Sequence, residues 1–290
     1  MRGLGIGGVA VACVEELRIP NPIAYFTTDR ALIERNRAWL APHFLDADDR
    51  FDLVFQSFVL EAEGKVVLID PCTGNGKPHP VAQFDRLDVP WLARLEAAGY
   101  RPEDVDIVMC THLHHDHCGW NTMLRDGRWV PTFPRARYLM ARGEIERWDP
   151  RRPGHRPVDY NRDVFERSVL PVIEAGLVQV HDGALRIGDG LEVLPGPGHT
   201  AGHCWLQVRA DGGCAVFSGD TFHHPLQLAD PEIQFGGGDD LVQAAASRRR
   251  LIEHAAACGG LIVAAHLPWP HGVSVKMDRG QPVFAASAQA

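Results

Sequence analysis

The sequence predicts an α+β protein in which two β-sheets are faced by helices, and two patterns support this. Short apolar runs rich in β-branched residues recur along the chain and fall into two groups, which is typical of strands. Longer segments with helical periodicity lie among these runs. We find no internal repeat and no low-complexity linker, so residues 1–290 are expected to form one domain.

The strand predictions rest on apolar, β-branched sequence. They cover residues 9–14, 51–60, 65–70, 106–111, 137–140, 177–180, 191–194, 205–208, 215–218 and 261–265. Helical periodicity predicts helices at residues 91–98, 159–175 and 241–258, and the last has Asp240 as a candidate N-cap and Gly259 as a stop. The irregular segments 71–90 and 149–160 are candidates for lining a binding pocket. Periodicity alone leaves the strand order open.

The composition favours a globular protein with a small-molecule partner. Of the 290 residues 45% are hydrophobic, and the formal net charge of −8 comes without a basic block, which disfavours a nucleic-acid partner. A small neutral or weakly polar substrate fits this charge better. The sequence contains no apolar run of bilayer-spanning length, so no membrane partner is expected. A homodimer stays open.

The cysteine pattern indicates a reducing compartment. The seven cysteines include no C-x-x-C pair, so neither a disulfide framework nor a cysteine zinc site is indicated, and a cytoplasmic location is expected. Residues 3–13 resemble a short signal segment ending in a lipoprotein-like Ala10–Cys13. Because residues 9–14 also have the sequence of an opening strand, a secreted or lipid-anchored form is the disfavoured alternative.

One histidine cluster is the most specific signal in the chain. The segment 111–119 reads Thr-His-Leu-His-His-Asp-His-Cys-Gly and follows a predicted strand. In an extended segment, His112 and His114 point to the same side and can grip one ion, whereas Asp116 and His117 can turn toward another. Neutral imidazole and carboxylate are the ligands that zinc takes. The alternative, a solvated polar loop, poorly explains four histidines and an aspartate in six residues.

Three further candidate ligands are individually weak. His199, Asp220 and His266 each follow a strand-like run, and each alone could be a turn or core residue. Together with the cluster at 112–117, they make up the ligand set expected of a dinuclear site.

These motifs, covering residues from about 50 to 275, resemble the metallo-β-lactamase superfamily. The resemblance implies an αββα sandwich of two mixed sheets flanked by helices. It also implies two divalent metal ions, with Zn²⁺ as the expected metal. By the same resemblance, His112, His114 and His199 bind the first ion, Asp116, His117 and His266 bind the second, and Asp220 bridges them together with a hydroxide.

Departures from other members narrow the resemblance to small-molecule hydrolases. True β-lactamases lack the bridging aspartate, flavodiiron proteins replace the second histidine by glutamate, and nothing here looks like the basic arm of RNA-processing members. The C-terminal third resembles the methyl parathion hydrolase and N-acyl-homoserine lactonase branch. Many lactonases have tyrosine three residues after the bridging aspartate, and this chain has His223. The resemblance assigns a branch and leaves the substrate open.

The chemistry expected of such a site assigns roles to further residues. A hydroxide between the metals is the expected nucleophile, with Asp116, Asp220 and His223 as the catalytic residues. Residues expected to hold the ligands in place are Asp70, Thr111, Thr200 and His203. Residues expected near the substrate are Trp120, Phe222, His224 and Trp269. For each of these, a turn, cap or core role is the alternative.

The expected activity is hydrolysis of a carboxylic ester or lactone, with organophosphate triester cleavage as a promiscuous extra. One alternative is a thioesterase of the glyoxalase II kind, although residues 259–290 show no basic helical domain for glutathione. The other is a non-catalytic metal-binding or sensing protein that has kept the site.

Overall fold

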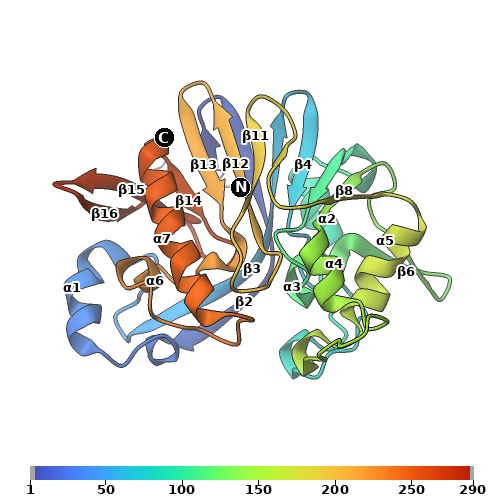
Figure 1. Ribbon diagram of the computed structural model, residues 1–290, viewed down its shortest axis with the longest axis horizontal. Coiled ribbons are helices and arrows are strands. Elements are labelled where there is room, and N and C mark those ends of the chain that lie inside the picture. Colours follow the sequence, from blue (N-terminus) through green and yellow to red (C-terminus); the bar gives the residue numbers. More distant parts are fainter. Residues whose placement is uncertain (1–3, 288–290) are drawn as a thin grey trace.

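The protein is a sandwich of two β-sheets whose outer faces are covered by helices, as the computed structural model shows for residues 4–287 (Figure 1). Each sheet has seven strands, and β6 (Thr122–Arg125) and β7 (Arg128–Pro131) form a separate two-stranded hairpin. The αββα architecture that the resemblance implies is confirmed. Each predicted strand run also contains a strand.

The first sheet comes from the N-terminal part of the chain. In spatial order its strands are β1 (Leu4–Ile6), β2 (Val9–Pro22), β3 (Arg50–Ala62), β4 (Lys65–Ile69), β5 (Ile107–Met109), β8 (Arg137–Ala141) and β9 (Val178–His181). The strands β1 to β4 pair antiparallel, whereas β4, β5, β8 and β9 pair parallel, so the sheet is mixed.

The second sheet comes from the C-terminal part. In spatial order its strands are β10 (Leu185–Arg186), β11 (Leu191–Pro195), β12 (Cys204–Ala210), β13 (Gly213–Phe217), β14 (Leu261–Val263), β15 (Gly272–Asp278) and β16 (Gln281–Ala286). Only β13 and β14 pair parallel in this sheet, so their following loops leave at the same edge.

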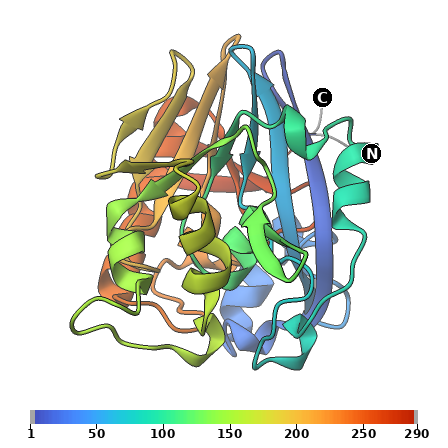
Figure 2. The same cartoon turned by 90° about the vertical axis from the view of Figure 1, so that its right-hand side faces the viewer.

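Helices cover the outer face of each sheet. They are α1 (Arg30–Leu40), α2 (Trp91–Ala97), α3 (His115–Cys118), α4 (Arg142–Trp148), α5 (Leu170–Glu174), α6 (Leu226–Ala229) and α7 (Leu241–Cys258). The residues of α2 and α5 pack on the first sheet, and those of α1, α6 and α7 pack on the second. Figure 2 looks onto the side of the molecule that carries α4 and α5. Within residues 4–287, no helix is long and apolar enough to cross a membrane.

Single-turn helices complete the connections between these elements. They are η1 (Ile23–Tyr25), η2 (Ala82–Phe84), η3 (Pro102–Asp104), η4 (Gly119–Asn121), η5 (Asp159–Asn161) and η7 (Gly219–Thr221), together with the π-helical turn η6 (Phe165–Val169).

Successive side chains of a strand point to opposite faces of the sheet, so one strand contributes residues to two hydrophobic cores. In β4, Val67 and Ile69 face the core between the two sheets, whereas Leu68 faces the core under α2 and α5. In β5, Ile107 and Met109 face the inner core and Val108 the outer one. Because successive side chains point to opposite faces, a strand buried on both sides reads as a continuous apolar run.

Two of the three predicted helices are confirmed, one with both ends and the other to within one residue. Helix α7 spans the predicted residues, the Asp240 side chain accepts a hydrogen bond from the Gln243 amide, and Gly259 ends the helix at a φ of 64°. Helix α2 ends one residue before the predicted 91–98.

The predicted helix at 159–175 is wrong in its continuity. Asp163 has a φ of 58°, which separates η5 from η6. Pro171 has no amide hydrogen for the Arg167 carbonyl, and this oxygen accepts a hydrogen bond from the Thr122 hydroxyl instead, at 2.6 Å. The backbone widens into the π-helical turn just before this proline, and α5 is short.

Several elements were not predicted from the sequence. Helix α1 has Asp29 as its N-cap, and its side chain accepts a hydrogen bond from the Leu32 amide. Asp29 is therefore a signal in the sequence for the start of this helix. The β15–β16 hairpin turns at Arg279 and Gly280, both with positive φ, which is also a readable turn signal. The strands β1, β6, β7 and β10 are too short to show periodicity.

The ends of the parallel strands bring distant segments together. Ile69 and Met109 are paired in the first sheet, so the loops after β4 and β5 start side by side. Phe217 and Val263 are paired in the second sheet, so the loops after β13 and β14 do the same. These four loops carry Asp70, the 112–117 cluster, Asp220 and His266.

Gly119 allows two of these segments to pack backbone against backbone. A Cβ atom added to Gly119 would lie 1.8 Å from the Thr73 carbonyl oxygen. The Gly119 amide also donates to the Cys72 carbonyl at 2.6 Å. Because Gly119 has an ordinary helical φ of −62°, the need for glycine here is steric rather than conformational.

We therefore expect Gly119→Ala to lower the free energy of unfolding by about 1–3 kcal/mol, the usual cost of overpacking a close contact. The measurement is urea unfolding of the metal-free protein. Gly237→Ala is the matched control, because its added Cβ would meet nothing within 4 Å. Equal stability of the two variants would contradict a rigid contact between Gly119 and Thr73.

Candidate metal centre

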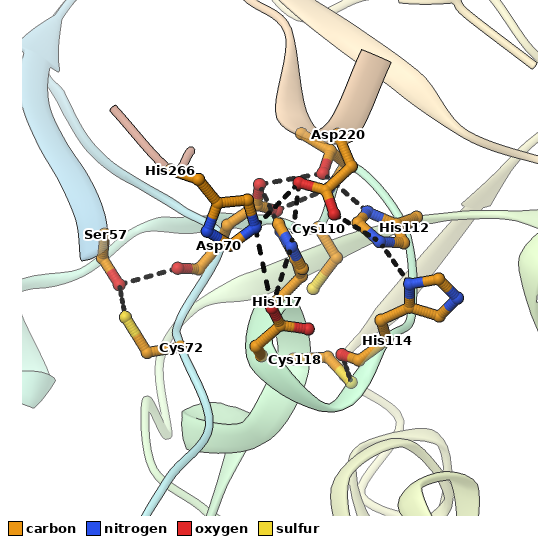
Figure 3. A network of polar contacts seen from close by, with 12 residues as sticks. Ser57, Asp70, Cys72, Cys110, His112, His114, His117, Cys118, Asp220 and His266 are labelled. Carbon is orange, nitrogen blue, oxygen red and sulfur yellow. Dashed lines mark hydrogen bonds and ion pairs between the residues drawn. The ribbon is translucent and has the colours of Figure 1, made fainter. Parts of the chain in front are cut away.

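The candidate ligands lie at the edge where the strand ends converge (Figure 3). After β5 the chain stays extended through His114, whose φ and ψ are −75° and 160°. His112 and His114 therefore reach the same group of side chains, as their alternation predicts. The single turn α3 then carries Asp116 and His117.

The first group contains His112, His114, His199 and Asp220. His114 Nδ1 lies 2.9 Å from His112 Nε2 and 3.1 Å from His199 Nε2. Asp220 Oδ2 lies 3.3 Å from His199 Nε2 and 3.8 Å from His112 Nε2. One lone-pair atom of each of the four side chains therefore faces a common point.

The second group contains Asp116, His117 and His266, and the other oxygen of Asp220 faces it. Asp220 Oδ1 lies 3.0 Å from His266 Nε2 and 3.2 Å from His117 Nε2. Asp116 Oδ2 lies 3.6 Å from each of the same two nitrogens. Asp220 thus has one oxygen in each group.

The spacing and chemistry of these atoms fit divalent metal ions. Ligand atoms arranged tetrahedrally about 2.0–2.2 Å from one ion lie roughly 3.3–3.6 Å apart, which falls within the 2.9–3.8 Å separations found in the two groups. His117 Nε2 and Asp220 Oδ1 are buried and face each other at 3.2 Å without the geometry of a hydrogen bond, and neither has another hydrogen-bond partner among the described residues. Buried polar atoms without partners are rare in folded proteins, and a shared cation would satisfy both.

Electrostatics keep the first group ready to bind a cation. Burial, followed by the neighbouring histidines, lowers the pKa of His112 well below its usual value, and burial lowers the pKa of His114 to about 3. Burial also lowers the pKa of His199 well below its usual value, although Asp220 opposes the shift. All three imidazoles are therefore neutral near pH 7, as a metal ligand must be.

Opposite charges dominate in the second group. Burial lowers the pKa of His117 and His266, but the Asp220 and Asp116 carboxylates outweigh it and raise both above the usual value. Burial raises the pKa of Asp220, but His117, His266 and His223 outweigh it and hold the pKa well below its usual range. The carboxylates and the histidines of this group therefore stabilise each other's charged forms.

Asp70 contacts two parts of the histidine cluster at once. Its Oδ1 accepts a hydrogen bond from the Thr111 amide at 2.7 Å, and its Oδ2 accepts one from the Thr111 hydroxyl at 2.8 Å. His117 Nδ1 lies 3.0 Å from the same Oδ2. This contact directs the other ring nitrogen of His117 toward Asp220.

Three of the four remaining candidate histidines have a partner on the ring nitrogen that faces away from the cluster. The Thr111 hydroxyl lies 3.2 Å from His112 Nδ1, as expected for Thr111. The Val54 carbonyl lies 2.9 Å from His266 Nδ1, and the Tyr160 hydroxyl lies 3.5 Å from His114 Nε2. Sequence analysis missed Val54, because it acts through its backbone, and Tyr160, although it falls in the 149–160 segment singled out as a pocket loop.

The other two predicted supporting residues behave differently from each other. His203 Nε2 accepts a hydrogen bond from the Asp220 amide at 3.1 Å, so it holds the backbone of the shared carboxylate. Thr200 is buried, and its carbonyl accepts from the Gly198 and His203 amides. Among residues 4–287, no hydrogen bond joins Thr200 to a ligand side chain, so its contribution is to the loop turn.

His223 lies against the cluster. Its Nε2 is 3.0 Å from Asp220 Oδ2, and its ring stacks on His266 with centroids 5.5 Å apart and an angle of 3° between the planes. Gln227 Oε1 accepts a hydrogen bond from the His223 amide. The side chain thus reaches the oxygen of Asp220 that belongs to the first group.

The residues expected near the substrate are mostly part of the packing. Trp120 stacks on Trp91 and donates its indole N–H to Glu16, and Phe222 is fully buried in the core under α7. His224 is buried, with Nε2 2.7 Å from the Phe44 carbonyl. These three positions are explained by the core, and their assignment to a substrate pocket is not retained. Trp269 is half-buried beside His271.

Comparison with known proteins identifies the family. The sequence profile of the Metallo-beta-lactamase superfamily matches residues 55–284. An N-acyl homoserine lactonase of Bacillus cereus is 26% identical over 146 residues, which are 50% of this chain and 49% of the relative. A probable metallo-hydrolase of Mycobacterium tuberculosis is 27% identical over 203 residues, covering 59% and 58% of the two chains. The chain thus spans about half the length of the curated lactonases it matches.

Solved structures with the same fold cover nearly the whole chain. A dizinc quorum-quenching lactonase in complex with a product has a TM-score of 0.75 at 17% identity, covering 100% of this chain and 98% of its own. A hydrolase of the β-lactamase superfamily has a TM-score of 0.77 at 22% identity, covering 99% and 97%. At these identities the likeness establishes the fold.

We expect Asp70→Ala to lower the free energy of unfolding of the metal-free protein by about 2–4 kcal/mol, because the buried Thr111 amide and hydroxyl lose their acceptor. Urea unfolding measures the loss, and hydrogen exchange of the Thr111 amide locates it. Asp182→Ala is the control, since Asp182 forms an exposed ion pair with Arg142 of the kind that contributes little. Unchanged stability and exchange in Asp70→Ala would contradict the anchoring role.

Proposed function

Because the chain belongs to the metallo-β-lactamase superfamily, we propose that it is a hydrolase that uses two zinc ions to cleave a small-molecule ester or lactone. One observation carries the proposal above all others. The carboxylate of Asp220 has one oxygen in each of two groups of metal-binding side chains. A carboxylate in this position is suited to link two cations.

We assign the first ion to His112, His114 and His199 and the second to Asp116, His117 and His266, with Asp220 shared. Imidazole and carboxylate ligands without thiolate suit zinc and similar borderline metals. Two ions held there would lower the pKa of a water molecule toward neutrality and polarise the carbonyl oxygen of an ester.

The protein itself supplies orientation and proton acceptors. Neither Cys118 nor Cys204 is suited to act as a covalent nucleophile, because burial raises the pKa of both thiols well above the usual value and leaves them protonated. Asp116 and Asp220 stay ionised, since the surrounding histidines hold the pKa of each below its usual range despite burial. They can therefore accept a hydrogen bond from an attacking water.

His223 is the candidate for protonating the leaving group. Its Nε2 lies at the Asp220 oxygen of the first group, and its ring is fixed by stacking on His266. A proton on Nε2 can be shared with Asp220 or passed to an oxygen that departs between them. This position is where the chain differs from the tyrosine of many lactonases.

A lactone or carboxylic ester is the substrate class we favour. The lactonases among the relatives and the fold neighbours make a lactone the first candidate. A thioester and a phosphotriester are the alternatives that a substrate panel separates, and a protein that binds zinc without turnover would be the sensing alternative.

We expect the zinc-replete protein to carry close to two zinc ions per chain and to hydrolyse lactones or aryl esters, with activity lost on chelation and regained with zinc. Elemental analysis and a panel of lactones, aryl esters, thioesters and phosphotriesters test this. Asp220→Asn should lose metal and turnover together, whereas Asp182→Ala should change neither. One tightly held ion would contradict the dinuclear proposal, and two ions without turnover would favour the sensing alternative.

We expect His223→Ala to lower kcat for an alkyl lactone by roughly 10²-fold with metal content unchanged, and to lower kcat for a nitrophenyl ester much less. A good leaving group departs as an anion and needs no proton. His43→Ala, which removes an exposed histidine, is the control. Equal losses for both substrates, together with lower thermal stability, would leave His223 a packing role only.

A further inference from the structure

A second kind of carboxylate lies beside the ligand loops without facing a metal group. Glu144, in the first turn of α4, is 1% exposed and has no ion-pair partner among the described residues. Burying an unpaired carboxylate is costly unless hydrogen bonds compensate it. The hydrogen bonds that Glu144 accepts therefore explain how a carboxylate can be buried at this position.

Those hydrogen bonds come from both loops of the first ligand group. Glu144 Oε2 accepts from the Leu113 amide at 3.0 Å, and Oε1 accepts from the Gly202 amide at 2.8 Å. Leu113 lies between His112 and His114, and Gly202 lies three residues after His199. One carboxylate thus joins the segments that carry all three histidines of this group.

The loops also meet where His114 Nδ1 lies 3.1 Å from His199 Nε2, which joins side chains rather than backbones. They share a backbone hydrogen bond at their base, from the Cys204 amide to the Thr111 carbonyl. The Leu113 carbonyl accepts a hydrogen bond from the Asn161 side chain, so both polar groups of this residue are held. Gly202 has no room for a side chain, because an added Cβ would lie 2.5 Å from the Glu144 amide nitrogen.

We propose that Glu144 is a positioning residue that sets the distance between the His112–His114 segment and the His199 loop and so tunes affinity for the first ion. This inference rests on the proposed function, since it requires that the site binds metal. A carboxylate can accept from both amides at once. A glutamine in its place keeps one acceptor and turns an N–H₂ group toward the other amide, which frees one loop.

The chain contains a closely matched control. Glu16 is also buried, at 3% exposure, and accepts hydrogen bonds from two backbone amides, Thr73 and Gly74, and from the Trp120 indole. Glu144 accepts hydrogen bonds from donors of the same kinds, two backbone amides and the Trp148 indole. The segments joined by Glu16, around Thr73 and Trp120, contain no assigned ligand of the first group and share backbone hydrogen bonds of their own, from the Gly119 amide to the Cys72 carbonyl and from the Trp120 amide to the Pro71 carbonyl. Substituting Glu16 therefore costs similar stability without touching the first ligand group.

Zinc titration of the metal-free proteins against a chromophoric chelator tests the proposal without any substrate. His199→Ala and His266→Ala identify which of the two binding steps belongs to which group. We expect Glu144→Gln to raise the dissociation constant of the step that His199→Ala removes by about 10–100-fold, as loss of a ligand-orienting contact does, and to leave the other step unchanged. Glu16→Gln should leave the first step at its wild-type value despite lower thermal stability.

Three outcomes would overturn the proposal. They are a wild-type first step in Glu144→Gln, equal weakening of both steps, and the same weakening of the first step in Glu16→Gln. If Glu144→Gln does not fold, Glu144→Asp replaces it, because a carboxylate one methylene shorter cannot reach both amides and should weaken the same step. Wild-type protein that binds no zinc would reject the proposed function itself, which is a distinct result.

Discussion

The geometry of the whole site depends on the short distance between the two carboxylate oxygens of Asp220. Asp220 offers one oxygen to each group of ligands, so the two groups can lie no farther apart than its two oxygens allow. Its backbone is fixed by His203, and the preceding Gly219 leaves no space for a Cβ, which would lie 2.5 Å from the Thr111 hydroxyl. The loops from both sheets must close around this residue, and the parallel pairs β4–β5 and β13–β14 provide the common edge on which they do so.

Buried carboxylates in this protein have two separate tasks. Asp116 and Asp220 face histidine nitrogens, whereas Asp70, Glu144 and Glu16 accept hydrogen bonds mainly from backbone amides, hydroxyls and indoles. The first kind supplies negative charge at the site. The second kind makes the backbone around it rigid, because each such residue joins segments that are distant in sequence. Imidazole rings crowded within hydrogen-bond distance of one another depend on that rigidity, since each ring could otherwise rotate away.

The sequence predicted those features that depend on local pattern. Apolar, β-branched runs located the strands, the Asp240 and Gly259 signals located α7, and the spacing of His112, His114, Asp116 and His117 pointed to the ligand cluster. Features that depend on contacts between distant segments were missed. Glu144 follows a predicted strand with no motif around it, and its role arises only when the His199 loop packs on α4. Trp120 and Phe222 lie next to motifs in sequence, yet strand and helix geometry turns them into the core. The single-domain organisation and the cytoplasmic location stay predictions.

The division of the ligands between the two sheets also affects the order in which the protein folds and binds metal. Residues His112, His114, Asp116 and His117 belong to the first half of the chain, and His199, Asp220 and His266 to the second. During synthesis, the early cluster leaves the ribosome long before β14 exists to present its partner. Neither ligand set is complete until the two sheets have packed against each other. Two ions would therefore bind only after the sandwich has folded, and would not nucleate an earlier folding intermediate.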